Sequence, residues 1–513
     1  MKAIFISSVS ACIEKDDFTP YFSNEKYNVY LNGELIYEQK QENVFSLFNL
    51  TPNTEYSVSV LGKTLTFTTD SVTKEINAKD FGAVGDGKAD DTKSLQTAID
   101  NCEKGGMVTV PKGEYKTVNL MLKSDITLNL LQGARLIGET NPEKYPIMPD
   151  QIVDDFGKEK VVSVWEGAVM KSYASLIGGY SVNNVKIVGQ GVIDGNAQNG
   201  PWWQDQYVCS KEVARPRAVF LNDCKNIGFH GVTIENGAAW NVHPFFSENV
   251  GFYNVKVNAP KRSPNTDGIN PEGCDKVDII GCVISTGDDC IAIKSGTRAL
   301  AEKYKRSADN YTIRNCLMND GHGAVVIGSE MSGGVKNLTV NKCLFLGTDR
   351  GLRIKTRRNR GKLAVVDGVE FSNIKMQGVL TPLVMNMFYN CGIDGQEEYV
   401  WSREVYPIDD GTPYLGSVTF KDIDCEGVEV CAGWFDGLPE RPIEKVEIEN
   451  MNFTFKDGEK QKNVPALANG VKSVSGLGLY FNNVKKVVLN KVKVIGAEGE
   501  DYIFSNCQEK QIF

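Results

Sequence analysis

Histidine is scarce in this chain of 513 residues, which contains only His230, His243 and His322. A metal or catalytic site built on a cluster of histidines therefore has little to draw on. Long apolar runs are missing too, because no stretch approaches the roughly 18 consecutive apolar residues of a membrane-spanning helix. We expect neither a histidine-rich metal centre nor a membrane partner.

Positive charge is in deficit as well, with 56 basic against 65 acidic side chains and a net charge of −9. A chain of this charge has no general affinity for nucleic acid or for an anionic membrane surface. An anionic ligand must instead find a local basic patch. The hydrophobic share of 41% and the charged share of 24% are those of a globular protein.

The cysteines and the first residues indicate a compartment. The apolar run that follows Met1 breaks within a few residues and gives way to Glu14 and Asp17, which is unlike a secretion signal. Thirteen cysteines, an odd number, suit reduced thiols better than a disulfide framework. We therefore expect a cytoplasmic protein, with secretion or a periplasmic location as the alternative.

Residues 18–70 alternate apolar and polar side chains in short runs, which predicts antiparallel strands. The segment from Leu50 through Pro52 to Tyr56 resembles the corner of fibronectin type III domains, where the tyrosine hydroxyl bonds to upstream backbone. An ordinary hairpin with one buried tyrosine is the alternative. We predict a small β-sandwich over residues 1–75 and a second domain over residues 76–513. At the start of the second domain, residues 91–99 are typical of a helix capped by Asp91.

A repeat begins near residue 180 and predicts the architecture of the second domain. Apolar residues recur two, five and seven places after each of a series of apolar positions, at irregular intervals. These positions are Ile227, Val250, Val277, Tyr311, Leu338, Val369, Val418, Val446 and Val487.

Each repeat contains two short strands with a bend that reverses the alternation. Strands this short bury their inner face only by stacking on the next coil, so the pattern predicts a parallel β-solenoid. Cys282, Cys316, Cys343 and Cys425 fall on its inward positions, where we expect buried thiols that serve as apolar filler.

A third strand in each coil brings polar residues together. Aligning residues 287–294, 321–328 and 348–355 turns Arg353 and Lys355 outward on one face. The same register places Asp267, Asp288, Asp289 and His322 on neighbouring coils. Asp288 and Asp289 share one groove only if a turn opens at Gly287.

This combination points to glycoside hydrolysis. Clustered carboxylates repel one another, which raises the pKa of at least one member. One acid then stays protonated while its neighbours are ionised. One such acid can protonate a leaving oxygen while a carboxylate activates water. Arg353 and Lys355 suit a substrate carboxylate, and Arg357, Arg358, Arg360 and Lys362 extend the positive charge of the groove.

Four motifs in order, Asn265-Thr266-Asp267, Gly287-Asp288-Asp289, Gly321-His322-Gly323 and Arg353-Ile354-Lys355, resemble those of glycoside hydrolase family 28, the polygalacturonases. The resemblance covers roughly residues 76–513. It implies a right-handed parallel β-helix that hydrolyses α-1,4-linked galacturonate with inversion, without metal or cofactor. Inversion in turn implies that acid and base are about 6.5–9.5 Å apart.

The resemblance also implies roles for individual residues. Asp288 resembles the general acid, and Asp267 and Asp289 the carboxylates that activate water. His322 resembles the residue that supports the acid. Arg353 and Lys355 resemble the binders of the substrate carboxylate, and Tyr389 an active-site tyrosine, although a core tyrosine explains it equally well.

The N-terminal sandwich and the residues after His322 resemble bacterial exo-acting members of this family. Exo action needs a groove blocked at one end, and segments 139–180 and 195–215 are long enough to supply a wall. Trp202 and Trp203 in the second segment suit a sugar-stacking face or a buried core.

Several alternatives stay open at this stage. An endo-acting polygalacturonase and a rhamnogalacturonan or xylogalacturonan hydrolase share the fold, and so does a calcium-dependent pectate lyase. From a different class, a carbohydrate-binding solenoid without turnover fits the repeat but not the clustered acids. The oligomeric state is left open.

Overall fold

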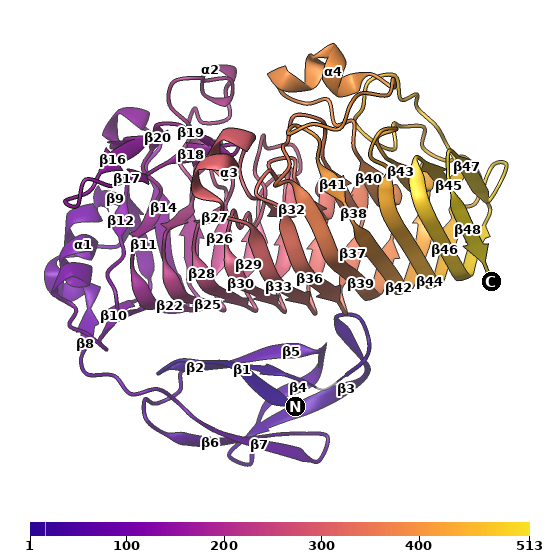
Figure 1. Ribbon diagram of the computed structural model, residues 1–513. Coiled ribbons are helices and arrows are strands. Elements are labelled where there is room, and N and C mark those ends of the chain that lie inside the picture. The colour runs from indigo at the N-terminus through magenta and orange to yellow at the C-terminus, as the bar shows by residue number, and fades with distance from the viewer. Residues whose placement is uncertain (16) are drawn as a thin grey trace.

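The computed structural model describes residues 1–15 and 17–513, without the side chains of residues 393 and 394. A long solenoid lies above a small sheet domain formed by the N-terminal residues (Figure 1). Loops and short helices gather on the upper side of the solenoid, away from the small domain. In the described part of the chain, no helix has the length and apolarity needed to cross a membrane.

The N-terminal domain is a β-sandwich, as predicted. Three antiparallel strands in the order β1-β2-β5 form one sheet, and four in the order β4-β3-β6-β7 form the other. The Tyr56 hydroxyl accepts a hydrogen bond from the backbone N–H of Thr51 at 2.8 Å, which is the upstream contact that the corner motif predicts. The seven strands are β1 (Lys2–Ile6), β2 (Ser10–Glu14), β3 (Phe22–Leu31), β4 (Glu34–Glu42), β5 (Val44–Phe48), β6 (Glu55–Val60) and β7 (Lys63–Thr68).

The solenoid is a right-handed parallel β-helix, in agreement with the predicted fold class. Its largest sheet has 24 strands, and successive coils pair in parallel. These strands are β8 (Glu75–Asn77), β9 (Asp86–Asp90), β10 (Met107–Val110), β11 (Gly113–Thr117), β13 (Thr127–Leu130), β14 (Ala134–Gly138), β22 (Asn183–Gly189), β23 (Val192–Asp194), β25 (Lys225–His230), β26 (Thr233–Glu235), β28 (Glu248–Tyr253), β29 (Lys256–Asn258), β30 (Asp275–Ile280), β31 (Val283–Ser285), β33 (Ala308–Arg314), β34 (Leu317–Asn319), β36 (Val335–Asn341), β37 (Leu344–Leu346), β39 (Val365–Gln377), β41 (Tyr414–Leu415), β42 (Ser417–Val428), β44 (Ile443–Phe455), β46 (Val484–Ile495) and β48 (Glu509–Ile512).

The predicted apolar ladder is the register of this sheet. Ile227 pairs with Val250 and Val250 with Val277, and the same correspondence continues without a slip to Val446 and Val487. A slip of one residue would turn every inward side chain outward, so burial of one face specifies the register. The solenoid starts at β8, well before residue 180. The repeat is hidden in this first part because long excursions interrupt the first coils.

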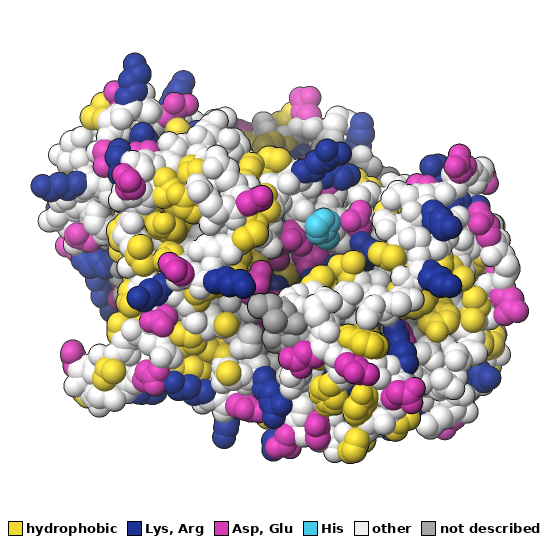
Figure 2. All heavy atoms as spheres, turned by 90° about the horizontal axis from the view of Figure 1, so that it is seen from above, with side chains coloured by type: hydrophobic (Ala, Val, Ile, Leu, Met, Phe, Trp, Pro, Cys, Tyr) yellow, Lys and Arg dark blue, Asp and Glu magenta, His cyan; other side chains and the backbone are white. Residues whose placement is uncertain are grey.

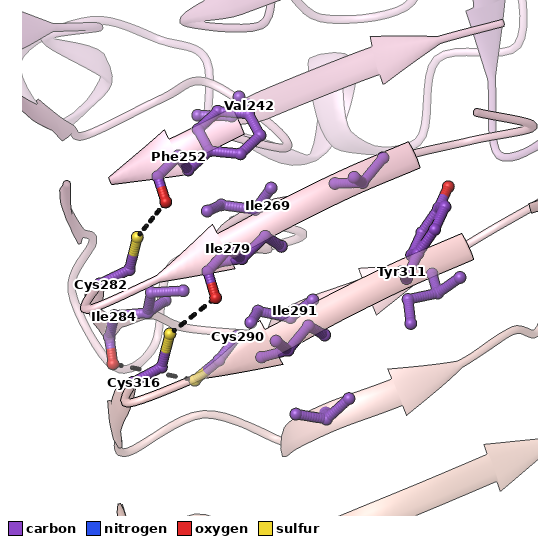
Figure 3. Packing of buried hydrophobic residues seen from close by; sticks show 14 of the residues in the cluster. Val242, Phe252, Ile269, Ile279, Cys282, Ile284, Cys290, Ile291, Tyr311 and Cys316 are labelled. Carbon is purple, nitrogen blue, oxygen red and sulfur yellow. Dashed lines mark hydrogen bonds between the residues drawn. The ribbon is translucent and has the colours of Figure 1, made fainter. Parts of the chain in front are cut away.

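The cysteines of the ladder are buried, as predicted. Cys282 and Cys316 lie fully buried among isoleucine and phenylalanine side chains and donate weak hydrogen bonds to the carbonyls of Phe252 and Ile279 (Figure 3). Cys343 and Cys425 are equally buried. All thirteen cysteines are free thiols in the described structure, so several of them act as core-filling side chains.

A second face of the solenoid carries the four ordered motifs and consists of two shorter parallel sheets. One contains four strands and the other seven, and isolated bridges at Ile269 join them through Val242 on one side and Ile291 on the other. The strands are β12 (Leu120–Met121), β21 (Ile177–Tyr180), β24 (Val219–Asn222), β27 (Val242–Phe245), β32 (Asp289–Ile293), β35 (Gly323–Ile327), β38 (Arg350–Lys355), β40 (Thr381–Asn386), β43 (Cys431–Asp436), β45 (Leu477–Asn482) and β47 (Tyr502–Ser505).

Short helices and small hairpins project from the coils of the solenoid. The α-helices are α1 (Thr92–Asn101), α2 (Asp205–Val208), α3 (Arg298–Tyr304) and α4 (Glu398–Trp401), and the 3₁₀ turns are Ala78–Phe81, Pro142–Lys144, Ala197–Asn199 and Ile393–Gln396. The segment between β14 and β21 forms three two-stranded sheets from β15 (Ile147–Met148), β16 (Gln151–Val153), β17 (Glu159–Val161), β18 (Val164–Trp165), β19 (Ala168–Val169) and β20 (Ser172–Tyr173).

Helix α1 covers the N-terminal end of the solenoid core with Leu95, Ala98 and Ile99. The helix is where the sequence predicts it, but the expected cap is wrong. The Asp91 side chain does not cap α1 and instead accepts hydrogen bonds from the backbone N–H groups of Val84 and Gly85 at 2.6 and 3.0 Å. The buried Asp91 carboxylate satisfies both N–H donors of this turn. If the side chain capped α1 instead, these two donors would lose their partner.

The sandwich is docked on the face formed by the large sheet. Glu14 forms a two-pronged ion pair with Arg314, at 2.7 and 3.0 Å. The buried His230 ring lies between the hydroxyls of Ser10 and Ser46, at 2.8 and 2.9 Å. These contacts place the small domain on the underside of the solenoid in Figure 1, away from the face that carries the motifs.

Candidate active site

Three carboxylates meet where the two shorter sheets join. Asp267 precedes the bridge residue Ile269, and Asp288 and Asp289 stand at the start of β32 on the next coil. One oxygen from each lies within 4.8 Å of the others. Figure 2 shows the result from above, with acidic side chains recessed in a hollow beside a histidine.

The turn expected at Gly287 is present, since the chain bends at residues 287 and 288 before β32 begins. The bend lets the two neighbouring aspartates face the same hollow. Asp289 is fully buried, at 1% exposed, whereas the Asp288 side chain is 24% exposed. Asp288 is thus the carboxylate nearest to an incoming ligand, and Asp267 and Asp289 form the floor.

Glycine is required beside the site. Gly321 has a φ of +90°, and a Cβ there would lie 2.7 Å from the carbonyl oxygen of Asp288. This tight turn delivers His322, whose backbone N–H donates to the Asp288 carbonyl at 3.0 Å and whose Nδ1 lies 3.3 Å from Oδ1 of Asp288. His322 is half exposed at the mouth of the hollow, while His230 and His243 are fully buried.

The two predicted cations lie on the opposite side of the acids. Lys355 Nζ donates to Asp289 Oδ2 at 2.7 Å, and a guanidinium nitrogen of Arg353 lies 3.5 Å from Oδ1. The ring of Tyr389 lies 5.4 Å from Lys355 Nζ and 5.8 Å from the Arg353 guanidinium carbon. The structure therefore brings all seven predicted site residues together.

The proton of the acid cluster rests on the buried Asp267. Burial, together with the charge of Asp288, raises the pKa of Asp267 to about 8. Burial also acts on Asp288, but the hydrogen bond and charge of His322 outweigh it and lower the pKa of Asp288. The same hydrogen bond raises the pKa of His322. Without substrate, the site thus holds a neutral Asp267 and an ionised Asp288 paired with His322.

The acids of the cluster approach one another closely. One oxygen of each carboxylate lies within 4.8 Å of the others, while about 6.5–9.5 Å between whole carboxyl groups is typical of inverting pairs. The reason is architectural: Asp288 and Asp289 are neighbours in the chain, and Asp267 stands on the adjacent coil at the strand spacing of about 4.8 Å. The solenoid itself sets this distance.

Several residues of the site escaped the sequence analysis. Lys294, at the end of β32, pairs with Glu330 at 2.7 Å and lies 4.5 Å from the centre of the Trp240 ring. Asn270 donates to Asp267 Oδ2 at 2.9 Å and fixes that carboxylate. The alternation of β32 turns Lys294 outward, a signal available in the sequence. Glu330 lies in the segment after His322 that resembles exo-acting members, but nothing local marks Trp240, which arrives from another coil.

The basic run after Lys355 does not extend the groove, contrary to expectation. Arg358 is fully buried in an ion pair with Glu440 at 2.6 Å, and Arg357 and Arg360 are also buried. Lys362 pairs with Asp410 at the surface. Arg358 also donates to the carbonyls of Tyr399 and Ser402 and so holds the loop around α4 in place, because a buried guanidinium satisfies several carbonyls at once.

The two tryptophans of segment 195–215 are divided between core and loop. Trp202 is fully buried against Tyr145, Tyr173 and Tyr207 and offers no sugar-stacking face. Trp203 is partly buried, and its Nε1 donates to the carbonyl of Gly237 at 3.3 Å. Both hold the excursion against the solenoid.

A hairpin from segment 139–180 reaches the site instead. Strands β18 and β19 pair around a two-residue turn, Glu166–Gly167. Trp165 stacks on Trp240 at 5.5 Å, and the carbonyl of Gly167 accepts two hydrogen bonds from Thr297, both at 2.9 Å. The hairpin therefore stands beside Lys294 and Glu330 at one end of the acid cluster.

Comparison with known proteins assigns the chain to a family. Residues 107–465 match the model described as Glycosyl hydrolases family 28. A "Probable polygalacturonase" of Vitis vinifera is 30% identical over 404 residues, which is 77% of this chain and 77% of that protein. An "Exo-poly-alpha-D-galacturonosidase" of Dickeya chrysanthemi is 31% identical over 359 residues, 63% of this chain and 58% of that protein.

A solved structure supports the fold over the whole chain. The family 28 exopolygalacturonase of Yersinia enterocolitica superposes with a TM-score of 0.74 at 21% sequence identity. The match covers 99% of this chain and 97% of that one. The sandwich and the solenoid are both included in this similarity.

Proposed function

Since the chain belongs to glycosyl hydrolases family 28, we propose that it hydrolyses the α-1,4 bonds of galacturonate chains and removes single sugars from one end. The observation that carries this proposal is the acid cluster on the floor of the hollow, flanked by Arg353 and Lys355. Three carboxylates would repel a polyanionic chain, whereas the two cations would attract it. A catalytic role explains why the acids stand in the same site as these cations.

Asp288 is the general acid of the proposed mechanism. It is the most exposed of the three carboxylates, and it lies beside His322, which can supply or share a proton. A bound galacturonate brings a negative charge to Arg353 and Lys355 and so weakens their effect on Asp288. This change raises the pKa of Asp288 and favours its protonated form in the complex.

Asp267 and Asp289 activate the water that attacks the anomeric carbon. Asp289 is held by Lys355 and Arg353, and its Oδ1 has no hydrogen-bond partner among the described residues, which leaves an acceptor for water. A carboxylate already engaged by two cations is a poor nucleophile, so a single displacement with inversion follows. Asp288 accepts the proton of Asp267 as its own pKa rises in the complex, and the ionised Asp267 completes the base.

The β18–β19 hairpin supports exo action. It stands across one end of the acid cluster, and its tip packs so tightly on Glu330 that a Cβ on Gly167 would lie 2.9 Å from the Cβ of that residue. A polymer that must pass this end meets backbone and aromatic side chains. We propose that one sugar is held between the hairpin and Asp288, so that the enzyme releases monomers.

We also propose a cytoplasmic location, where the substrates are imported oligogalacturonates rather than polymer. Thirteen free thiols suit a reducing compartment. For residues 1–75 we propose a fibronectin type III-like domain, supported by the Tyr56 corner. Its position away from the acid cluster gives it no part in catalysis.

The first prediction concerns the general acid. Asp288→Asn should reduce the rate on trigalacturonate by about 10²–10⁴-fold, because the asparagine side-chain amide cannot transfer a proton to the leaving oxygen. The measurement follows reducing sugar together with chromatography of the products. The control is Glu248→Gln, which alters an exposed ion pair with Lys225 on the large sheet and should leave the rate unchanged.

The same experiment tests each part of the proposal. Monomer released first from oligomers supports exo action, and early mixed oligomers would refute it. A β-anomer as the first product, seen by proton NMR, supports inversion, and an α-anomer would refute inversion alone. A product that absorbs in the ultraviolet would identify a lyase instead.

A further inference from the structure

The turn of the β18–β19 hairpin carries an unusual residue. Both turn positions have positive φ values, +47° at Glu166 and +75° at Gly167. Two-residue turns of this kind normally take asparagine, aspartate or glycine, because long side chains are strained there. A glutamate at the first position suggests a function for its side chain rather than for the backbone.

The hairpin holds Glu166 firmly in place. Trp165 packs on Trp240 and lies under two guanidinium groups, those of Arg215 at 5.4 Å and Arg217 at 5.1 Å. The carbonyl of Val164 accepts a hydrogen bond from Arg217, and Thr297 fixes the carbonyl of Gly167. The tip is therefore a preorganised element and not a loose loop.

The Glu166 side chain lies at the tip of this hairpin, within electrostatic range of Asp288 and Glu330. It is solvent-exposed, yet enough protein surrounds it for burial to raise its pKa. Glu330 and Asp288 raise the pKa of Glu166 further, whereas Lys294 and Arg215 oppose them. Among the described residues no hydrogen bond or ion pair engages the carboxylate. An exposed, unengaged carboxylate within electrostatic range of the proposed general acid is available to a ligand.

We propose that Glu166 accepts hydrogen bonds from the C3 and C4 hydroxyls of the terminal galacturonate, and that it thereby selects saturated non-reducing chain ends. This inference rests on the proposed exo action. A sugar between Asp288 and the hairpin has its anomeric carbon at Asp288. Its C4 lies across the ring, on the side of Glu166.

Two consequences follow from a carboxylate at this position. A chain end produced by a lyase has a double bond between C4 and C5 and carries no C4 hydroxyl, so it leaves Glu166 without a donor. A further uronate beyond the terminal sugar would bring a second negative charge against Glu166, which reinforces the closure of this end. Glu166 thus favours one ligand and disfavours two others.

The test compares saturated and 4,5-unsaturated trigalacturonate as substrates. For the wild type we expect kcat/KM to be about 10- to 100-fold higher on the saturated trimer, the range for a lost hydrogen bond to a charged group. Glu166→Gly, which suits the positive φ, should reduce the preference to within about threefold through a loss on the saturated trimer alone. Glu166→Gln should lie between the two.

The matched control is Glu159→Gln, which removes a carboxylate from the neighbouring β17 strand, where it pairs with Lys303 on the outside. It should keep the full preference. Equal rates of the wild type on both trimers, or an unchanged preference in Glu166→Gly, would overturn the inference.

Product analysis with a label on the reducing end separates this failure from failure of the proposed function. Monomer without label as the first product, together with no preference, refutes the role of Glu166 and keeps exo action. Labelled monomer shows that the closed end faces the reducing terminus and refutes the placement of Glu166. Mixed oligomers refute exo action itself.

Discussion

Three aspartates of identical chemistry are set apart by their surroundings. Asp288 lies next to His322 at the mouth of the hollow, Asp289 is held by Lys355, and Asp267 is buried against Asn270. Burial and the charge of Asp288 raise the pKa of Asp267, whereas the neighbouring imidazole lowers the pKa of Asp288. Each carboxylate is thus prepared for a different task.

Protein stability should depend on pH through Asp267. Between the ordinary aspartate pKa of 3.8 and about 8, the folded protein keeps this proton while the unfolded chain releases it. Stability is therefore lost as the pH rises through this window. Asp267→Asn, which cannot ionise, should unfold at the same temperature as the wild type near pH 4 and several degrees higher at pH 8–9. Thermal unfolding followed by circular dichroism across this range measures the difference.

The control for this effect is Asp86→Asn. Hydrogen bonds from the backbone N–H groups of Ala89 and Lys88 lower the pKa of Asp86, so its stabilising effect is present above pH 4 and lost in acid. Its substitution should therefore shift the unfolding temperature in the opposite direction. A variant of Asp267 that gains nothing at pH 8–9 would contradict the buried, protonated state.

The parallel strands of the solenoid place the site residues in a row, and the loop segments that leave the coils shape the site around that row. β32, β35 and β38 place Asp289, Gly323 and Arg353 on adjacent strands, with inward partners Ile291, Val325 and Leu352 in register. Nothing in this row limits the length of a bound chain. In the proposed exo action, the β18–β19 hairpin sets this limit.

Loosening the hairpin should therefore change the product pattern. Trp165→Ala removes the stack on Trp240 and the two cation–π contacts, each worth about 0.5–1.5 kcal/mol. We expect monomer release to slow about 10-fold and dimers or trimers to appear early in digests of a long oligomer. Time-resolved chromatography of the products measures this change.

Phe156→Ala is the matched control, because this aromatic residue lies at the tip of the adjacent β16–β17 hairpin and is 95% exposed. The wild-type pattern should persist in this variant. Strict monomer release by Trp165→Ala would show that another element closes the groove.

At the scale of the whole molecule, the sandwich is fastened to the solenoid by partly buried polar groups. Glu14 accepts hydrogen bonds from Arg314 and from Asn315, and burial lowers the pKa of His230 to about 3, so this ring stays neutral between Ser10 and Ser46. The stability of such an interface depends on each charged partner, because removing one partner leaves the other charge buried and unpaired.

Arg314→Ala should weaken this interface, since it leaves Glu14 without its cation. We expect a loss of about 1–3 kcal/mol and faster cleavage of the segment between the domains in limited proteolysis. The rate on trigalacturonate should stay within about twofold, because the sandwich lies away from the acid cluster. Lys225→Ala, which breaks an exposed ion pair on the same sheet, is the control and should change neither property. A large loss of activity would place the sandwich in the catalytic unit.

Patterns in the amino-acid sequence were enough to predict the solenoid, its register and the seven residues that meet in the hollow. These follow from local rules, because alternation in short strands and burial of one face leave a single register. The tertiary structure set which carboxylate holds the proton, how close the acids lie and where the β18–β19 hairpin stands. These depend on long excursions whose ends are fixed by contacts between distant residues, such as Trp165 with Trp240 and Gly167 with Thr297, and no local pattern encodes such contacts. The arginines at 357, 358 and 360 illustrate the same limit, since a basic run is solvated or buried according to the carbonyls and carboxylates that reach it from other coils.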